Sequence, residues 1–375
     1  MTKVQYQYIR DEAELEKLCD RFSRLQTFAL DTEFVRERTF YPQAGLLQLS
    51  DGEQIYLVDP VSCESLDSFI QLLENPFVCK VMHSASEDID LFLSLGALQL
   101  ANFYDTQIAA SWLGSGLSLS LQKLVEQHAN IVLDKSQTRT NWLRRPLTEQ
   151  QLQYAALDVE YLLDIAESQR ELIGNLGFSD MLHQDNQLLV SSNLPDTELA
   201  YLSVNGAYRL NDAQRDSLQR LAAWRERVAR RDDKPRPHVL KDADLITIVT
   251  QLNQANDINK IGLSPGFVRR YTDEVLAVLF EQRSEPSNPV VRLQDIKGGR
   301  EMLKELRAAM LEISEQKNIP IEVFPSKRWL EAIIKHLAVA WYPKPNLWTG
   351  WRKELIMPVI ENLKQKYPLI REQKS

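Results

Sequence analysis

Two carboxylates stand two residues apart in an otherwise apolar stretch near the N-terminus. Residues 27–34 read as a buried strand that contains Asp31 and Glu33. Because alternate residues of a strand face the same way, both acids share one face with Ala29. Burying neighbouring like charges is costly unless they are protonated, paired with cations or bound to a divalent metal. A solvated strand end is the alternative reading, and this pair alone does not choose between the two.

Two expected helices carry acids that could join this pair. In a helix beginning at Thr148, Tyr154 and Asp158 lie one turn apart, so that the phenol and the carboxylate project together. A half-exposed aspartate beside a tyrosine would look the same. A helix expected over residues 86–95 begins with an acidic turn of Glu87, Asp88 and Asp90. The positive end of a helix dipole favours acids in any protein, so spacing does not identify a functional one.

The elements that must position these residues form an α/β pattern in the first half of the chain. Strands are expected at residues 4–9, 27–34, 46–50, 54–58 and 78–83, with a hairpin turn at Asp51-Gly52. Helices are expected at residues 11–22, 66–73 and 86–95, and from about residues 105, 118 and 148. Three sequential strands followed by alternating helix and strand predict a mixed sheet flanked by helices.

The second half reads as helix throughout, in two related modules. A polar stretch at residues 191–196 and the segment to Asn211 are interpreted as a linker, and a proline-containing break follows at residues 284–289. The hydrophobic pattern of Val239-Leu240, Leu245-Ile246 and Val249 recurs 84 residues later as Val323-Phe324, Trp329-Leu330 and Ile333. The predicted domains are residues 1–200 with a linker to about 210, residues 211–290, and residues 291–375.

Composition restricts the class of protein. The 375 residues are 44% hydrophobic and 26% charged, an ordinary globular mixture that argues against a wholly disordered chain. No apolar run reaches the ~20 residues of a membrane span, and the N-terminus lacks a signal peptide. Three scattered cysteines are too few for a disulfide framework or a zinc site. We expect a soluble, cytoplasmic protein, and a monomer.

The net charge of −8 hides a division along the chain. Residues 1–200 contain 14 lysines and arginines against 30 acidic residues, whereas residues 201–375 contain 30 against 22. A basic half suggests contact with nucleic acid, although two solvated surfaces of different charge would look the same. Within the basic half, the arginines of residues 225–236 cluster in a way that suits binding of a phosphate backbone.

Three short motifs carry a resemblance to a known family. Asp31-Thr32-Glu33-Phe34, Met82-His83-Ser84-Ala85-Ser86-Glu87-Asp88 and Tyr154-Ala155-Ala156-Leu157-Asp158 resemble the exonuclease motifs of the DEDD superfamily, and Tyr154 is typical of its DEDDy branch. The segment from Phe103 to Ala110, together with Trp142 and Arg145-Pro146-Leu147, resembles the ribonuclease D group. The two helical modules resemble paired HRDC domains.

The resemblance implies an α/β fold of the RNase H type followed by two all-α HRDC-type domains. It also implies a metal-dependent 3′–5′ exoribonuclease that releases 5′-mononucleotides, with tRNA precursors and other small structured RNAs as substrates. Asp31, Glu33, Asp88 and Asp158 would hold two divalent ions, and Tyr154 would orient the attacking water. Oxygen ligands favour Mg²⁺ or Mn²⁺ over Zn²⁺. The alternatives are a DNA-preferring exonuclease and an inactive RNA-binding protein.

Four residues are predicted to contact the substrate. Phe34 would either pack in the core or wedge against the terminal base, and His83 would contact a nucleotide or be held by local hydrogen bonds. Lys135 and Arg145 belong to a basic loop before the catalytic helix, for which solvated charge is the alternative to phosphate contact. Asp105 is interpreted as a helix N-cap, and the tryptophans Trp341, Trp348 and Trp351 as core residues.

Overall fold

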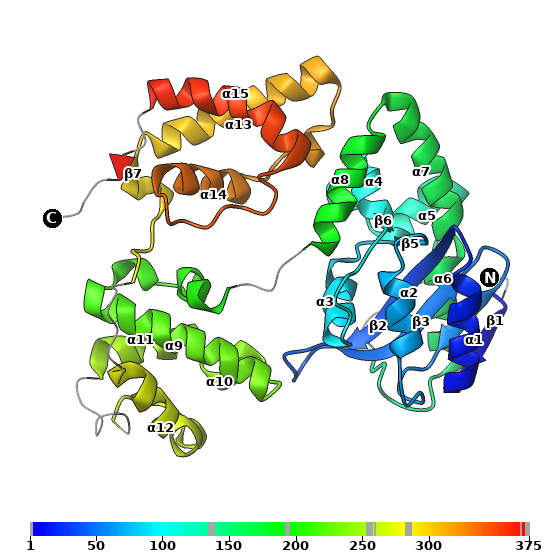
Figure 1. Cartoon of the computed structure of the whole chain (residues 1–375), viewed down its shortest axis with the longest axis horizontal. Helices are drawn as coiled ribbons and strands as arrows, with labels where there is room; N and C mark the ends of the chain where they lie inside the picture. The colour runs from blue at the N-terminus through cyan, green and yellow to red at the C-terminus, as the bar shows by residue number, and fades with distance from the viewer. Residues whose placement is uncertain are drawn as a thin grey trace.

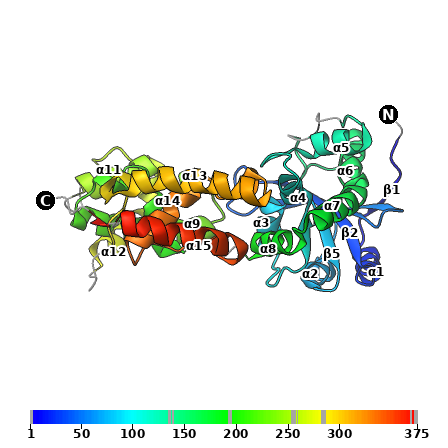
Figure 2. The same ribbon diagram turned by 90° about the horizontal axis from the view of Figure 1, so that it is seen from above.

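The structure, a computed structural model, describes residues 3–133, 137, 140–191, 196–252, 258, 260–281, 287–367 and 370–371. It consists of an α/β domain and two helical modules that lie together at one end of it (Figures 1 and 2). Within the described ranges, no helix combines the length and the hydrophobicity that crossing a membrane would require.

The α/β domain is built on one mixed sheet with the strand order β1-β4-β3-β2-β5-β6. The pairs β2–β3 and β3–β4 are antiparallel, whereas β1–β4, β2–β5 and β5–β6 are parallel. This confirms the mixed sheet that the sequence predicts. The strands are β1 (Tyr6–Ile9), β2 (Thr27–Val35), β3 (Gln43–Ser50), β4 (Ile55–Val58), β5 (Cys79–Met82) and β6 (Phe103–Asp105).

Each face of the sheet has its own hydrophobic cluster. Phe28 and Leu30 face the side covered by α1 (Glu12–Phe22), α2 (Asp67–Glu74) and α3 (Ser86–Ser94). Ala29 faces the opposite side, where it clusters with Ala155 and Val159 of α6 (Glu149–Glu160). The alternation along β2 therefore directs the face that carries Asp31 toward α6.

The helical periodicity after Thr148 conceals a break. We expect one apolar stripe through Ala166, but α6 ends at Glu160 and α7 (Leu162–Leu176) begins two residues later. Tyr161 lies between them with φ −105° and ψ −4°, so the chain stays close to helical and the stripe keeps its spacing. The domain is completed by α4 (Thr106–Trp112), α5 (Leu121–Ala129) and α8 (Ser179–Val190). The short strand β6 is too brief to leave a periodic signal.

The two helical modules share one order of elements. The first contains α9 (Asp212–Arg231), α10 (Arg236–Val239), α11 (Asp242–Gln251) and α12 (Pro265–Phe280). The second contains η4 (Leu293–Asp295), α13 (Gly299–Lys317), η5 (Ile321–Val323), α14 (Lys327–Ala338) and α15 (Gly350–Lys366), with a short pairing of β7 (Ile296–Lys297) and β8 (Ile370–Arg371). Trp348 and Trp351 are buried in the second module, in agreement with the core assignment.

One expected linker is part of a core instead. Residues 196–210 form two short turns, η1 (Thr197–Ser203) and η2 (Ala207–Arg209), that pack against α9. Tyr201, Val204 and Ala207 are buried in the hydrophobic cluster of the first module. Short 3₁₀ turns bury a few widely spaced side chains, which gives no helical or strand period to recognise.

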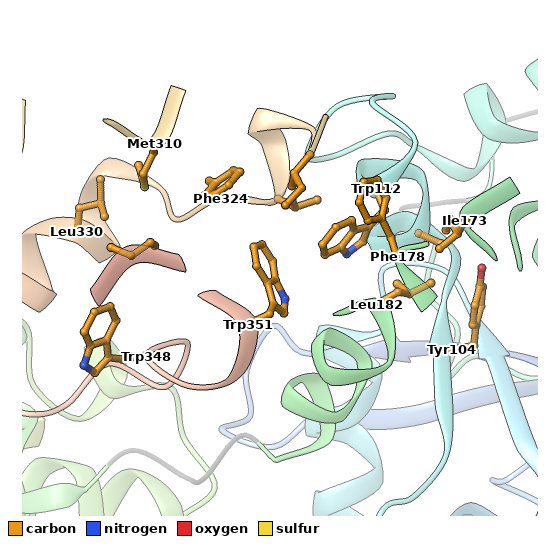
Figure 3. Close-up of a cluster of buried hydrophobic side chains, with 14 of the residues drawn as sticks. Tyr104, Trp112, Ile173, Phe178, Leu182, Met310, Phe324, Leu330, Trp348 and Trp351 are labelled. Atoms are coloured by element: carbon orange, nitrogen blue, oxygen red, sulfur yellow. The ribbon is translucent and has the colours of Figure 1, made fainter. Parts of the chain in front are cut away.

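An aromatic cluster joins the second module to the α/β domain. Trp351 lies between Phe324 of its own module and Trp112 of α4, with ring centroids 5.7 and 5.0 Å away (Figure 3). Phe178 packs on the other side of Trp112 at 5.2 Å. All of these side chains are buried, so the two parts share one continuous core.

A buried ionic cluster lies beside these rings. Asp185 of α8 accepts hydrogen bonds from the indole Nε1 of Trp112 and of Trp351, each at 3.0 Å, and pairs with both terminal nitrogens of Arg352. The Nε atom of Arg352 donates to the carbonyl of Val323 at 3.0 Å. The charge of Asp185 is therefore fully matched inside the interface, which fixes the orientation of the second module.

The first module contacts the loop that follows strand β2. Phe40 is buried in the hydrophobic cluster of that module. Its backbone N–H and that of Tyr41 both donate to Asp233 Oδ1, at 2.9 and 3.0 Å. The guanidinium of Arg236 lies 4.9 Å from the Phe40 ring centroid. The strand that carries Asp31 thus runs directly into a contact between domains.

Candidate active site

Strand β2 presents the first two acids. Asp31 pairs in register with Gln48 and Glu33 with Leu46 of β3, and the register shifts by a bulge immediately after Glu33. Both side chains are half-buried. A bulge bends the strand and re-aims the side chains beside it. Asp31 is therefore paired within the regular part of β2, and Glu33 lies directly before the bulge.

Helix α3 brings Asp88 to the same place. Its side chain is buried and accepts a hydrogen bond from the hydroxyl of Thr32. The turn before the helix is held by Asp105, whose carboxylate accepts from the backbone N–H groups of Ser84 and Ala85 at 3.0 and 2.9 Å. Ser84 has φ +59° in this turn. Asp105 also caps α4, accepting from the N–H of Gln107 and Ile108, so its predicted role as an N-cap is confirmed.

Helix α6 supplies the tyrosine and the fourth acid. It begins with a capping box in which Thr148 and Gln151 satisfy one another's backbone N–H groups. Tyr154 and Asp158 are both half-buried, and the Tyr154 side chain is hydrogen-bonded to Asp158. The Tyr154 ring lies 6.2 Å from Trp142, which is buried. Packing against Trp142 therefore sets the direction of the phenol.

The electrostatics of the site connect Asp31 and Glu33 with Asp88 and Asp158. Burial and then the charges of Asp158, Asp88 and Glu33 hold the pKa of Asp31 well above its usual value. Burial and the charges of Asp158 and Asp88 raise the pKa of Glu33 to about 9. Burial raises the pKa of Asp88 and of Asp158 to about 7.

The donor set suits a hard divalent cation. In the described part of the chain, no ion pair joins a lysine, arginine or histidine to any of these four acids. Carboxylate oxygens without a protein counter-charge are the ligands that Mg²⁺ and Mn²⁺ prefer. Within the part of the chain that the structure describes, no group of three or more His, Cys, Asp or Glu side chains is arranged to hold a metal ion.

The four predicted substrate contacts fall into different environments. Phe34 is half-exposed beside Glu33 and belongs to none of the hydrophobic clusters of the described residues, which favours the wedge over core packing. His83 is hydrogen-bonded at both ring nitrogens, to Thr106 Oγ1 and to the Leu119 carbonyl, each at 2.9 Å. This geometry favours a structural role for His83. Lys135 lies outside the described residues.

Arg145 has an internal partner instead of a free guanidinium. It forms a bidentate pair with Asp59 and donates to the carbonyls of Gly45 and Trp142 at 2.7 and 2.8 Å. Hydrogen bonding to Asp59 raises the pKa of Arg145. At Gly45, an added Cβ would lie 2.6 Å from that of Trp142. Arg145 therefore attaches its loop to the sheet. Its guanidinium N–H groups are already hydrogen-bonded within the protein, which argues against the predicted contact with a phosphate.

The arginine cluster of the first module is paired internally as well. Arg225 binds Asp242, Arg227 binds Glu198, and Arg231 binds Asp232 and Glu274. Arg230 and Arg236 share Glu226. The predicted backbone-binding surface of residues 225–236 is thus largely neutralised by carboxylates, of which Glu226 and Asp232 lie within the segment and Glu198, Asp242 and Glu274 lie outside it.

Sequence reasoning missed two supporting residues. Thr32 points to the opposite side of β2 from Asp31, where it bonds Asp88, and Asp59 anchors Arg145 from the end of β4. Thr32 stands inside the first motif, but alternation along the strand turns it away from Asp31 and Glu33. Asp59 is 86 residues from its partner, so no local signal connects the two.

Divalent metal is expected to stabilise this protein more at pH 8 than at pH 5. The raised pKa values, about 9 for Glu33 and about 7 for Asp88 and Asp158, mean that the metal-free folded state binds more protons than the unfolded chain above about pH 4. The free energy of unfolding then falls with pH through this window, by ~1.4 kcal/mol per pH unit for each excess proton. A cation offsets the repulsion between the ionised acids.

Thermal unfolding from pH 5 to 8.5, with Mg²⁺ or with chelator, measures this effect. The variant Glu33→Gln removes the acid with the pKa of about 9, so its metal-free pH dependence should be flatter than that of the unmodified protein. A metal effect of the same size at every pH would contradict the assignment of these acids as ligands.

Three family models match successive parts of the chain. A model described as 3′-5′ exonuclease matches residues 6–173, and a model of the HRDC domain matches residues 214–279. A model described as Ribonuclease D, C-terminal HRDC domain matches residues 298–360. The matches fall on the α/β domain and on the two helical modules in turn.

Proteins named Ribonuclease D are similar to this chain over nearly its whole length. The one from Serratia proteamaculans (strain 568) is 34% identical over 378 residues, which cover 97% of this chain and 100% of that protein. The one from Escherichia coli (strain K12) is 33% identical over 384 residues, with coverage of 97% and 100%.

Solved structures give the same picture. The crystal structure of Escherichia coli RNase D, an exoribonuclease involved in structured RNA processing, matches with a TM-score of 0.90 at 32% identity and covers 97% of this chain and 100% of that one. The catalytic core of RRP6 from Trypanosoma brucei matches with a TM-score of 0.57 at 23% identity, covering 74% and 82%. The second likeness concerns the fold alone.

Proposed function

Since this chain belongs to the ribonuclease D family and is a 3′–5′ exoribonuclease, we propose that Asp31, Glu33, Asp88 and Asp158 bind the divalent metal on which the family depends. The observation that carries the proposal is that the charges of Asp88 and Asp158 act on both Asp31 and Glu33, at a site where no described lysine, arginine or histidine forms an ion pair with any of the four acids. When all four acids are ionised, their repulsion lowers the stability of the fold. Two dications would offset the four negative charges, which is why we propose two ions, Mg²⁺ or Mn²⁺.

The residues of the chain position the reaction. When bound, divalent ions supply stabilisation of the negative charge that develops on the phosphate oxygens. The phenol of Tyr154, oriented by Trp142 and bonded to Asp158, is placed to hold a water molecule in line with the terminal phosphodiester. Half-exposed Phe34 is placed to stack on the terminal base. Successive hydrolysis from the 3′ end yields 5′-mononucleotides.

The substrates that we propose are tRNA precursors with 3′ extensions and other small structured RNAs. The Escherichia coli relative is described as an exoribonuclease involved in structured RNA processing, and the two HRDC modules give this chain the same architecture. Such RNAs place the reaction in the cytoplasm. That the protein acts as a monomer stays a prediction, which analytical ultracentrifugation tests.

Product analysis tests the proposal. A 3′-extended tRNA incubated with Mg²⁺ or Mn²⁺ should lose nucleotides one at a time from its 3′ end, and chelator should stop the release. A DNA strand of the same sequence should be degraded more slowly. Release of internal fragments, or hydrolysis that persists in chelator, would contradict the proposed reaction.

Tyr154→Phe is expected to lower kcat about 10²-fold with little change in KM, because positioning groups of this kind contribute 10² or more to the rate. The ring keeps its packing against Trp142, so stability should change little. Tyr161→Phe, a half-exposed phenol seven residues later at the junction of α6 and α7, is the matched control. Steady-state kinetics on one RNA compare the two, and equal rates for both variants would remove Tyr154 from the mechanism.

A further inference from the structure

A groove runs along the second helical module and reaches the exonuclease domain. It lies between α13 and the segment from Glu322 to Lys327, with a volume of about 610 Å³. At Leu117 it continues into a smaller hollow of about 280 Å³ that is lined by Gln107 and Ile108 of α4. Both volumes share Leu117, Glu322, Phe324, Pro325 and Ser326. We call this continuous depression the C-terminal groove.

The groove is lined by cations that have few partners. Arg300, Lys304 and Arg307 follow one another at helical spacing on α13, so they form one exposed row. In the described part of the chain, neither Lys304 nor Arg307 forms an ion pair, and Lys304 only adds to the charges that lower the pKa of Glu305. Lys327 lines the other side and is paired with Glu331 at 3.8 Å, so the unpaired charge of the groove lies on α13.

The acidic side chains around the groove do not cancel this charge. Of the residues that line its larger part, only Glu322 is acidic. The cleft between the first module and the exonuclease domain is larger, about 1020 Å³, but Arg36, Arg225 and Arg236 in it are all paired with carboxylates. Among the described residues that line the larger cleft, Lys241 is without an ion pair, whereas the C-terminal groove has three such cations, Arg300, Lys304 and Arg307.

Two further features suit a nucleic-acid strand. The N-terminus of α14 opens onto the groove at exposed Ser326, whose side chain makes no capping bond, and this end of a helix favours negative charge. Leu117, Leu311 and Ile321 are large apolar side chains exposed by 62%, 50% and 41%. A row of cations beside apolar side chains matches the phosphates and the unstacked bases of a single strand.

The groove is held in a fixed position relative to the catalytic site. Arg352, which lines its smaller part, is the residue bound by buried Asp185. At the other end, Leu117 stands two residues before Leu119, whose carbonyl is bonded by both His83 and Gln107. His83 directly follows strand β5, at the turn into the helix of Asp88. Helix α13 extends toward this side of the exonuclease domain (Figure 2).

We infer that the C-terminal groove binds the phosphate backbone of unpaired RNA upstream of the 3′ nucleotide being removed. The inference rests on the proposed function, since it names a surface that feeds the same active site. The contact is electrostatic and independent of sequence, and it lets a long RNA be held while its 3′ end is trimmed.

The double variant Lys304→Gln/Arg307→Gln tests the inference. Each substitution is on an exposed side chain, so the fold is retained. In an Asp31→Asn background, which prevents digestion, fluorescence anisotropy with an unstructured RNA of roughly 20 nucleotides should show Kd raised about tenfold at low salt. The slope of log Kd against log salt should fall by about 1.4, since two phosphate contacts are lost.

A short substrate and a matched control separate this effect from others. With Asp31 intact, the double variant should release nucleotides from a trinucleotide as fast as the parent enzyme, because so short an RNA does not span both sites. Lys353→Gln/Lys364→Gln removes two exposed charges from α15 of the same module and should leave Kd unchanged.

Unchanged RNA affinity in the groove variant, or an equal loss in the control, would overturn the inference. If the groove bound a protein partner instead, the affinity for RNA would likewise be unchanged. Failure of the proposed function has a different signature: the parent enzyme would release no nucleotide from either RNA, while the binding measurement would still decide the fate of the groove.

Discussion

Asp31→Asn and Asp158→Asn should each reduce nucleotide release by at least ~10³-fold, since a metal site stabilises the transition state by several kcal/mol. Both carboxyls have a pKa raised by burial, so the fold already favours their neutral form. An amide resembles that neutral form in size and polarity. We therefore expect the variants to fold at least as stably as the parent, which separates catalysis from stability more cleanly than alanine would.

Steady-state release of mononucleotides in Mg²⁺, together with RNA binding by anisotropy, measures both halves of this prediction. Glu167→Gln, which removes an exposed acid from the outer side of α7, is the matched control and should keep full activity. Binding should persist in all three variants. Undiminished release by the two aspartate variants would rule out these acids as metal ligands.

Asp185→Ala should destabilise the protein by about 3–5 kcal/mol, the usual cost of leaving one partner of a buried ion pair uncompensated. The substitution leaves the buried Arg352 guanidinium without its carboxylate partner. It also removes the acceptor of the Trp112 and Trp351 indoles. Because the pair joins two domains, the loss should also loosen the second module. Thermal unfolding and limited proteolysis should show a lower transition temperature and faster cleavage between the domains.

A double replacement distinguishes lost charge from lost packing. Asp185→Leu/Arg352→Met leaves no buried charge and should recover part of the stability. Removing an exposed pair by Arg24→Gln, which faces Asp20 at the surface, should change the free energy of unfolding by less than ~0.5 kcal/mol. If the Asp185 variant unfolded at the same temperature as the Arg24 variant, the ionic cluster would contribute nothing to the interface.

The parts of the site that follow from local rules could be read from the sequence. Alternation along β2 correctly places Ala29 and Asp31 opposite Phe28 and Leu30, and the Asp105 cap and the start of α6 at Thr148 are local as well. The four acids come from three separate elements, so only the motifs, and not their spacing, indicated that they belong together.

What could not be predicted depends on partners that are distant in the chain. Arg145 and the arginines of residues 225–236 have the composition of a nucleic-acid surface, but distant acids pair with several of them: Asp59 with Arg145, Glu198 with Arg227 and Glu274 with Arg231. Free and paired arginines are identical in sequence. The exposed row on α13 contains only Arg300, Lys304 and Arg307, so its composition gives a weaker signal, although these residues form no ion pair in the described part of the chain.

The burial of Phe40 in the first module has a practical consequence for work with truncated forms of this enzyme. A fragment cut back to the α/β domain would present Phe40 to water, and loss of the second module would uncover Trp112 as well. Such a fragment carries every proposed catalytic side chain, but it exposes two aromatic patches that are prone to association. Self-association would then lower its measured rate for reasons unrelated to chemistry, so comparisons of truncated and whole enzyme should first match their states of assembly.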